Sequence, residues 1–252
     1  MSIIVINNDC LLESINLISA CDEQLIYNWN IKISFSVHQI LNEHFKKVFC
    51  NNMNKKVVYT FDDCFIYKKL DNLSIILTLH FMQFDFLQNM IISICMNKSR
   101  WNICVMIVVW KANDVLITMN LTHLNDYLFA IMKELKAKIV ISNIIYASTF
   151  KKIDVQIVLN LNDLFQLLKS DDLFINWVNA WCMNDVKSDD LIFVAFTSNS
   201  SDRLKDFMHT HDCLTLKHLF YNWNVKYIKE MRILQFASYV YCINVEWVNF
   251  TC

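Results

Sequence analysis

The segment Leu124-Asn-Asp-Tyr-Leu-Phe-Ala-Ile-Met-Lys-Glu-Leu-Lys136, followed closely by Ile139-Val-Ile141, decides the fold class. Apolar side chains recur in its first part at Leu128, Ile131, Met132 and Leu135. This spacing predicts a helix with one buried face. The β-branched run that follows predicts a short buried strand. A helix that leads directly into such a strand is typical of α/β proteins.

The same alternation extends along the rest of the chain. We predict strands at Ile3–Ile6, Ile31–Val37, Val57–Phe61, Ser74–Leu79, Ile103–Val109, Ile139–Ile141, Val155–Leu159, Leu191–Phe196 and Ile233–Ile243. We predict helices at Leu11–Asp22, His38–Phe49, Leu124–Lys136, Asp163–Lys169, Asp202–Met208 and Leu214–Met231. Uniformly apolar strands between helices indicate a parallel sheet with helices on its faces. We therefore expect an α/β fold, a distorted (β/α) barrel, with a doubly wound parallel sheet as the alternative.

Length and composition restrict the class of protein. The chain has 252 residues without a linker or low-complexity segment, which predicts a single α/β domain over residues 1–252. A hydrophobic fraction of 55% excludes disorder, and a net charge of -1 argues against a nucleic-acid partner. No apolar run predicts a membrane span. The first residues lack a basic stretch, so we expect no signal peptide and a cytoplasmic or recombinant origin. The oligomeric state stays open.

The chain contains no glycine and no proline, which indicates a sequence altered by selection or design. Turns that need a positive φ must therefore use asparagine, aspartate or a strained residue. Glycine-rich phosphate-binding loops are excluded. The 10 cysteines form no C-x-x-C pair, so we interpret them as buried free thiols in a reducing compartment.

The segment Lys55-Lys-Val-Val-Tyr-Thr-Phe-Asp-Asp63 is the strongest candidate for chemistry, because an apolar strand runs into two adjacent carboxylates. One carboxylate of such a pair can bind a cation while the other takes a proton from a metal-bound water. The cation also keeps both carboxylates ionised against their mutual repulsion. An ordinary turn with two aspartates is the alternative interpretation.

This segment resembles the first motif of the NodB-type polysaccharide deacetylases, a strand that ends in Thr-Phe-Asp-Asp-Gly. The resemblance implies a distorted (β/α) barrel that removes acetyl groups from a carbohydrate polymer with a bound divalent metal, often zinc. It implies that Asp62 is the general base and Asp63 a metal ligand, while Cys64 replaces the family's glycine. The similar region extends over residues 55–243.

Two histidines extend the resemblance. Thr122-His-Leu-Asn125 is similar to the end of the second motif, His-x-x-x-His, which implies that His123 is a metal ligand. Its partner position falls on Met119, a poor zinc ligand beside carboxylate and imidazole. Phe207-Met-His209 is similar to the last motif, Leu-x-His, which implies that His209 is the general acid, with His211 as a rival.

The resemblance implies a metal-dependent hydrolase. Asp63 and His123 would hold zinc, Asp62 would activate its water, and His209 would protonate the leaving group. The alternative is an engineered or degenerate α/β protein that keeps the fold without catalytic activity. Independently of the resemblance, His209, His211 and Asp212 could bind a metal by themselves if they lay on one strand.

Overall fold

A computed structural model describes residues 18–31, 40–60, 63–82, 90–119, 125–137, 139–143, 146, 150, 157–160, 186–197, 205–225 and 233–235. The contacts divide the chain into two compact units, Met1–Ser36 and Val37–Cys252. In the first unit the described helix is α1 (Ala20–Asn30), which begins after Ser19 because the Asp22 backbone N–H donates to the Ser19 hydroxyl at 3.1 Å. The single domain over residues 1–252 stays a prediction.

The second unit contains the remaining described helices and strands, which alternate from α3 to β5. In order they are α2 (Leu41–Asn52), β1 (Lys56–Tyr59), β2 (Cys64–Ile66), α3 (Tyr67–Met82), β3 (Ile91–Cys95), α4 (Arg100–Lys111), β4 (Val115–Thr118), α5 (Asn125–Glu134), β5 (Ile139–Ser142), β6 (Ile157–Asn160), β7 (Leu191–Thr197), β8 (Lys205–Thr210) and α8 (His211–Val225). β1 and β2 form an antiparallel hairpin apart from the main sheet.

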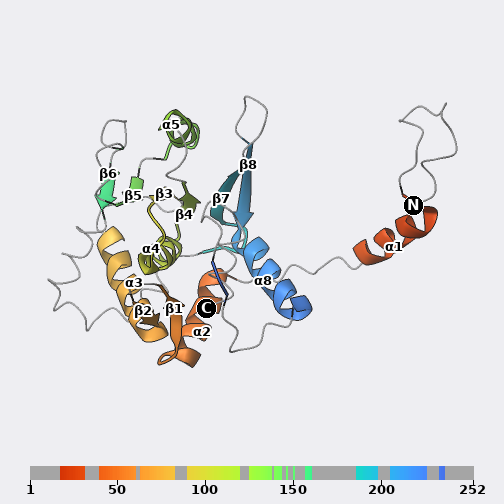
Figure 1. The fold of residues 1–252 in the computed structure, drawn as a ribbon, viewed down its shortest axis with the longest axis horizontal. Helices are drawn as coiled ribbons and strands as arrows, with labels where there is room; N and C mark the ends of the chain where they lie inside the picture. The colour runs from red at the N-terminus through yellow and green to blue at the C-terminus, as the bar shows by residue number, and fades with distance from the viewer. Residues whose placement is uncertain are drawn as a thin grey trace. The chain divides into compact units, whose positions relative to one another are not determined.

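Among the described residues, the main sheet contains six strands in the order β6-β5-β3-β4-β7-β8 (Figure 1). The first five are mutually parallel, and β8 runs antiparallel to β7. The α/β class and the parallel sheet are therefore confirmed. The expected distorted barrel is not formed by the described strands, because their sheet is open, with β6 at one edge and β8 at the other.

Helices cover both faces of this sheet, which explains why its strands are uniformly apolar. Ile92 and Ile94 in β3 pack into a core cluster that includes α4, whereas Cys95 belongs to a second cluster that includes α5. Neighbouring strands alternate in the same way, with Leu116 in the first cluster and Ile117 in the second. Successive strand residues point to opposite faces, so both must be apolar.

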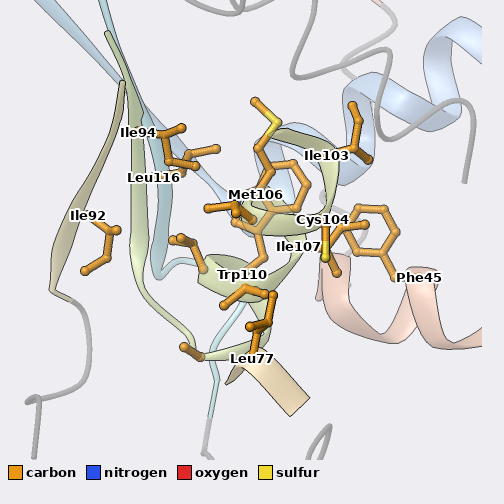
Figure 2. Packing of buried hydrophobic residues seen from close by; sticks show 14 of the residues in the cluster. Phe45, Leu77, Ile92, Ile94, Ile103, Cys104, Met106, Ile107, Trp110 and Leu116 are labelled. Atoms are coloured by element: carbon orange, nitrogen blue, oxygen red, sulfur yellow. The ribbon is translucent and has the colours of Figure 1, made fainter. Parts of the chain in front are cut away.

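Of the helices that the structure describes, α4 is the most deeply buried, and it lies between the sheet and other helices (Figure 2). Trp110 is fully buried and stacks on Phe45 of α2 at 5.6 Å between ring centroids. The predicted strand Ile103–Val109 is wrong, because these residues form the middle of α4. A helix that is apolar on every side loses the periodic signal that separates it from a buried strand. The predicted strand Ser74–Leu79 is wrong as well and lies within α3.

Several other predicted elements are confirmed, within a few residues, over the part of each that the structure describes. They are the strands at Val57–Phe61, Ile139–Ile141, Val155–Leu159 and Leu191–Phe196, and the helices at His38–Phe49, Leu124–Lys136 and Leu214–Met231. The predicted helix Asp202–Met208 is wrong, since Lys205–Thr210 forms the edge strand β8. The strands β2, β3 and β4 were not predicted.

The remaining predictions fall wholly or mainly outside the described residues. They are Ile3–Ile6, Leu11–Asp22, Ile31–Val37, Asp163–Lys169 and Ile233–Ile243. Among the residues that are described, no helix has both the length and the apolar character needed to cross a membrane.

Two helices end without the glycine that usually follows a helix. Asn113 after α4 has a φ of 58°, and Lys136 after α5 has a φ of 52°. In each case the next residue donates back across the last turn, Asp114 N to Val109 O at 3.1 Å and Ala137 N to Met132 O at 2.9 Å. These are Schellman motifs, whose left-handed position favours glycine. The expected use of asparagine at positive φ is thus confirmed at Asn113.

Candidate functional site

The parallel strands end at one side of the sheet, called here the carboxyl edge and defined by Cys95, Thr118, Ser142, Asn160 and Thr197. β3 and β4 are neighbours, and β3 leads into α4 while β4 leads into α5. These two helices belong to core clusters on opposite faces of the sheet. In open α/β sheets, ligands bind outside the carboxyl ends of strands at such a point.

Polar atoms appear at the carboxyl edge where otherwise apolar strands end. Cys95 of β3 is in register with Ser142 of β5, and Ile94 is in register with Thr118 of β4. The side chains of Cys95, Ser142 and Thr118 are all buried. This places a thiol and two hydroxyls in adjacent strands, close to the point where the chain leaves the sheet.

Asn143 follows directly after β5 and has an unsatisfied polar atom. The Ser142 hydroxyl donates to the Asn143 carbonyl oxygen at 3.2 Å. The side-chain oxygen of Asn143 is buried and has no hydrogen-bond partner within the described part of the chain. A buried acceptor without a donor costs free energy, so Asn143 is suited to receive a hydrogen bond from a bound molecule.

The charge state of the carboxyl edge is set by burial. Burial raises the pKa of the Cys95 thiol to about 12, which keeps it neutral and unreactive. Just beyond β3, the Lys98 ammonium donates to the Gln235 carbonyl oxygen at 2.7 Å, and burial lowers the pKa of Lys98. The described strand ends therefore offer neutral thiol, hydroxyl and amide groups that can orient a ligand, with the Lys98 ammonium just beyond β3.

Asp63 lies in the turn between β1 and β2, outside the main sheet. The Cys64 backbone N–H donates to its carboxylate at 2.7 Å, and Arg100 forms an ion pair with it. The hydrogen bond from Cys64, followed by that from Arg100, lowers the pKa of Asp63. The strand before Asp63 therefore belongs to a hairpin that is held to the start of α4.

The other residues assigned from the sequence are placed only in part. His209 lies in β8, where its ring stacks on Phe193 at 5.8 Å between centroids. Asp62 and His123 lie outside the described residues. Met119 is buried, and its backbone N–H donates to Ile94 O at 2.8 Å. The zinc site and the roles of Asp62, Asp63, His123 and His209 stay untested predictions.

The proposed cluster of His209, His211 and Asp212 does not form a metal site. His211 is buried, and its Nδ1 accepts a hydrogen bond from the Leu41 backbone N–H at 3.3 Å. Across the portion of the chain that the structure describes, no group of three or more histidine, cysteine, aspartate or glutamate side chains could hold a metal ion. The three residues also do not share one strand, since His209 lies in β8 whereas His211 and Asp212 begin helix α8.

Sequence reasoning missed the carboxyl edge. The available signal was a polar residue directly after an apolar run, as at Ser142-Asn143. That signal is weak without the strand order, because only the order shows which strand ends are neighbours.

Comparison with known sequences gives long but distant matches. No protein-family model matches the chain. The chain is 24% identical over 241 residues to the nonribosomal peptide synthetase imqB of Aspergillus flavus, which covers 93% of this chain and 7% of that protein. It is 23% identical over 244 residues to the synthetase easA of Emericella nidulans, covering 96% of this chain and 3% of that protein. The chain thus spans a small part of the curated relatives it matches.

Comparison with solved structures gives the same picture for the fold. VinN in complex with L-aspartate matches with a TM-score of 0.77 at 14% identity, over 85% of this chain and 60% of that one. The nonribosomal peptide synthetase FmoA3 matches with a TM-score of 0.74 at 14% identity, over 93% of this chain and 24% of that one.

These likenesses overturn the deacetylase prediction. The relatives and structural neighbours named above are peptide synthetases and a protein of their fold, and they are not NodB-type deacetylases. The metal-dependent hydrolase and the carbohydrate-polymer substrate are therefore wrong. The resemblance failed because it depended on a nine-residue segment and isolated histidines, which recur by chance. The alternative of an inactive fold is not better supported.

Proposed function

We propose that this chain is part of an adenylation domain, which activates an amino acid by joining its carboxylate to the α-phosphate of ATP. The supporting observation is that peptide synthetases occur among both the sequence matches and the structure matches. Each of these matches extends over about nine tenths of the chain. One FmoA3 structure is bound to α-methyl-L-serine-AMP, and VinN is bound to L-aspartate.

The carboxyl edge suits this chemistry. The carboxylate of the amino acid is itself the nucleophile, so the protein needs to align two substrates rather than supply a reacting group. Neutral hydroxyl and amide groups such as Ser142 and Asn143 can hold polar substrates in place by hydrogen bonds. An open parallel sheet with helices on both faces presents these groups at the point where such folds bind ligands.

The absence of glycine limits how ATP could bind. A phosphate cradle that needs glycine backbone is excluded, so side chains must supply more of the donors. The sequence Thr197-Ser-Asn-Ser-Ser201, which begins at the last residue of β7, offers hydroxyl groups of this kind. The chain spans 60% of VinN and a few per cent of the synthetase easA. We therefore propose, as part of the same function, that it acts on an amino acid and belongs to a larger synthetase.

Ligand binding by the full chain tests this function directly. Non-hydrolysable aminoacyl-adenylate analogues with acidic, polar, aliphatic and aromatic side chains would be titrated by calorimetry, with amino-acid-dependent exchange of pyrophosphate into ATP measured alongside. We expect one side-chain class to bind with micromolar affinity. A chain that unfolds cooperatively but binds no analogue and no ATP would refute the proposal.

Two matched substitutions locate the site. Asn143→Ala removes the buried acceptor at the carboxyl edge and is expected to weaken analogue binding about tenfold, the scale of one lost hydrogen bond. Ser93→Ala is the control, because Ser93 is also buried in the sheet but lies within β3 and away from the edge. Equal effects of both substitutions would place the ligand elsewhere.

A further inference from the structure

The described cysteines fall into distinct environments. Cys95 and Cys104 are buried, Cys64 is half-buried, and Cys21, Cys50 and Cys213 are exposed. Cys213 differs from the other exposed thiols because its Sγ lies 3.6 Å from Nδ1 of His209. The sequence offers many pairings of cysteine and histidine, and the fold brings this exposed thiol and this imidazole within hydrogen-bonding distance.

Both members of the pair are held by well-packed elements. The His209 ring belongs to β8 and stacks on Phe193 of β7, with an interplanar angle of 26°. Cys213 lies in the first turn of α8, where its backbone N–H donates to the Thr210 hydroxyl at 3.2 Å. A nucleophile within reach of a base that a third group orients is the arrangement by which proteins activate a thiol.

We propose that Cys213 is a thiol-modification site that forms mixed disulfides with small soluble disulfides, with His209 as its proton acceptor. The Cys213 thiol loses its proton to the imidazole, and its sulfur attacks one sulfur of the disulfide. A new S–S bond forms, the old S–S bond breaks, and the leaving thiolate takes the proton back from His209. The Cys213 sulfur is oxidised and the leaving sulfur is reduced, so no further oxidant is needed.

The environments of other thiols make this site selective. Burial raises the pKa of Cys95 and of Cys104 to about 12, and neither sulfur is accessible to a reagent in the folded chain. Cys50 is exposed near the end of α2, one turn after Lys46 and Lys47. Cys50 is therefore a matched control, an exposed thiol that also lies on a helix.

The site is independent of the proposed adenylation function. β8 runs antiparallel to β7, and its last residue Thr210 is in register with Leu191, the first residue of β7. Cys213 follows three residues later, in the first turn of α8, and so lies at the side of the sheet opposite the carboxyl edge. Modification of Cys213 and binding of an adenylate analogue can therefore succeed or fail separately.

The test measures each thiol separately in the full chain. Oxidised glutathione would be added at pH 6.5, free thiols would be trapped by alkylation at set times, and each cysteine would be quantified by peptide mass spectrometry. We expect Cys213 to form the mixed disulfide at least about tenfold faster than Cys50. In the urea-unfolded chain this difference should disappear, because urea removes the junction of β8 and α8 that holds the His209 Nδ1 beside the thiol.

The variant His209→Gln separates a base from a merely structural neighbour. It should lower the Cys213 rate at pH 6.5 to that of Cys50, leave Cys50 unchanged, and shift the pH profile of Cys213 to higher pH. Its thermal midpoint would be compared with the parent to verify folding. Equal rates for Cys213 and Cys50 in the unaltered folded chain, or a Cys213 rate that folded His209→Gln does not change, would overturn the proposal.

Discussion

Lys111 is a charged residue whose side chain is fully buried at the end of α4. Its ammonium donates to the Asp71 carboxylate at 2.6 Å and to the Ser74 hydroxyl at 2.7 Å. These contacts join α4 to α3 inside the core. Removing one partner of a buried ion pair leaves an uncompensated charge, whereas removing both is often nearly neutral.

This contrast gives a prediction for Asp71 and Lys111. Asp71→Ala should lower the free energy of unfolding by about 3 kcal/mol, because the buried ammonium loses its counter-charge. The double variant Asp71→Ala/Lys111→Met should recover most of that loss. Urea denaturation at pH 7 measures both values, and a double variant less stable than Asp71→Ala would contradict the argument.

Asp114 is a second buried ionisable residue, and it lies directly before β4. Burial raises its pKa to about 7, although the Met90 backbone N–H donates to its carboxylate at 3.0 Å. Between pH 4 and pH 7 the folded chain therefore holds a proton that the unfolded chain, with its pKa near 3.8, has released. Stability from this group is present at low pH and is lost as the pH rises towards 7.

Asp114→Asn should remove this dependence because the amide keeps the acceptor for Met90 without ionising. We expect the variant to exceed the parent in stability at pH 8 by about 2 kcal/mol and to match it near pH 4. Urea melts across this pH range provide the measurement. A variant that parallels the parent at every pH would show that Asp114 does not titrate in this way.

At the level of single elements, the absence of glycine affects the ends of helices, where a residue with a side chain must adopt a positive φ. Lys136 is exposed and adopts the left-handed conformation after α5, where a side chain is disfavoured. Lys136→Gly should raise the free energy of unfolding by about 1 kcal/mol. Lys133→Gly, within the last turn of the same helix, is the control and should lower it by a similar amount. Thermal melts of both variants measure the two changes in stability. A lower melting temperature in Lys136→Gly than in the parent would refute the prediction.

Element identity was predictable where only one face of an element is buried. Helix α5 follows its sequence pattern because its outer face includes exposed Lys133 and Glu134. Helix α4 shows no such pattern, because ten consecutive residues, Asn102–Lys111, are all buried. For such a segment composition alone favours a strand, and length and tertiary packing decide.

At the scale of the whole molecule, α8 packs on α2 through histidines. The rings of His44 and His218 meet edge to face at 4.4 Å between centroids, and His211 accepts a hydrogen bond from Leu41 at the start of α2. Burial lowers the pKa of both His211 and His218 to about 4. The Asp190 carboxylate opposes this shift at His211, whereas His44 adds to it at His218. Burial and then Lys47 lower the pKa of His44.

These shifts predict acid instability. Between pH 6.5 and pH 4 the unfolded chain binds protons on these imidazoles that the folded chain excludes, so stability is lost as the pH falls through this range. His218→Gln should reduce that loss and move the midpoint of acid unfolding to lower pH. Its pH slope should change in the direction opposite to that of Asp114→Asn. Hydrogen exchange of α8 at pH 5 checks whether this helix is released first, and unchanged acid unfolding in His218→Gln would contradict the prediction.

The α/β class, the parallel sheet and the use of asparagine or a strained residue at positive φ were all predictable from the sequence. These properties follow from local periodicity and composition, which the chain carries whatever its tertiary structure. The candidate site did not follow, because local motifs at Asp62-Asp63 and His209 led to a hydrolase that the comparisons contradict.

Contacts between residues that are distant in the sequence were not predictable before the fold was known. Ser142 is in register with Cys95, Lys111 contacts Asp71 and His218 meets His44, although each pair is far apart in the sequence. Strand order and helix packing set these contacts, and both depend on burying apolar surface across the whole domain. The function of a site built from strand ends is therefore absent from any short stretch of sequence and appears when the sheet is assembled.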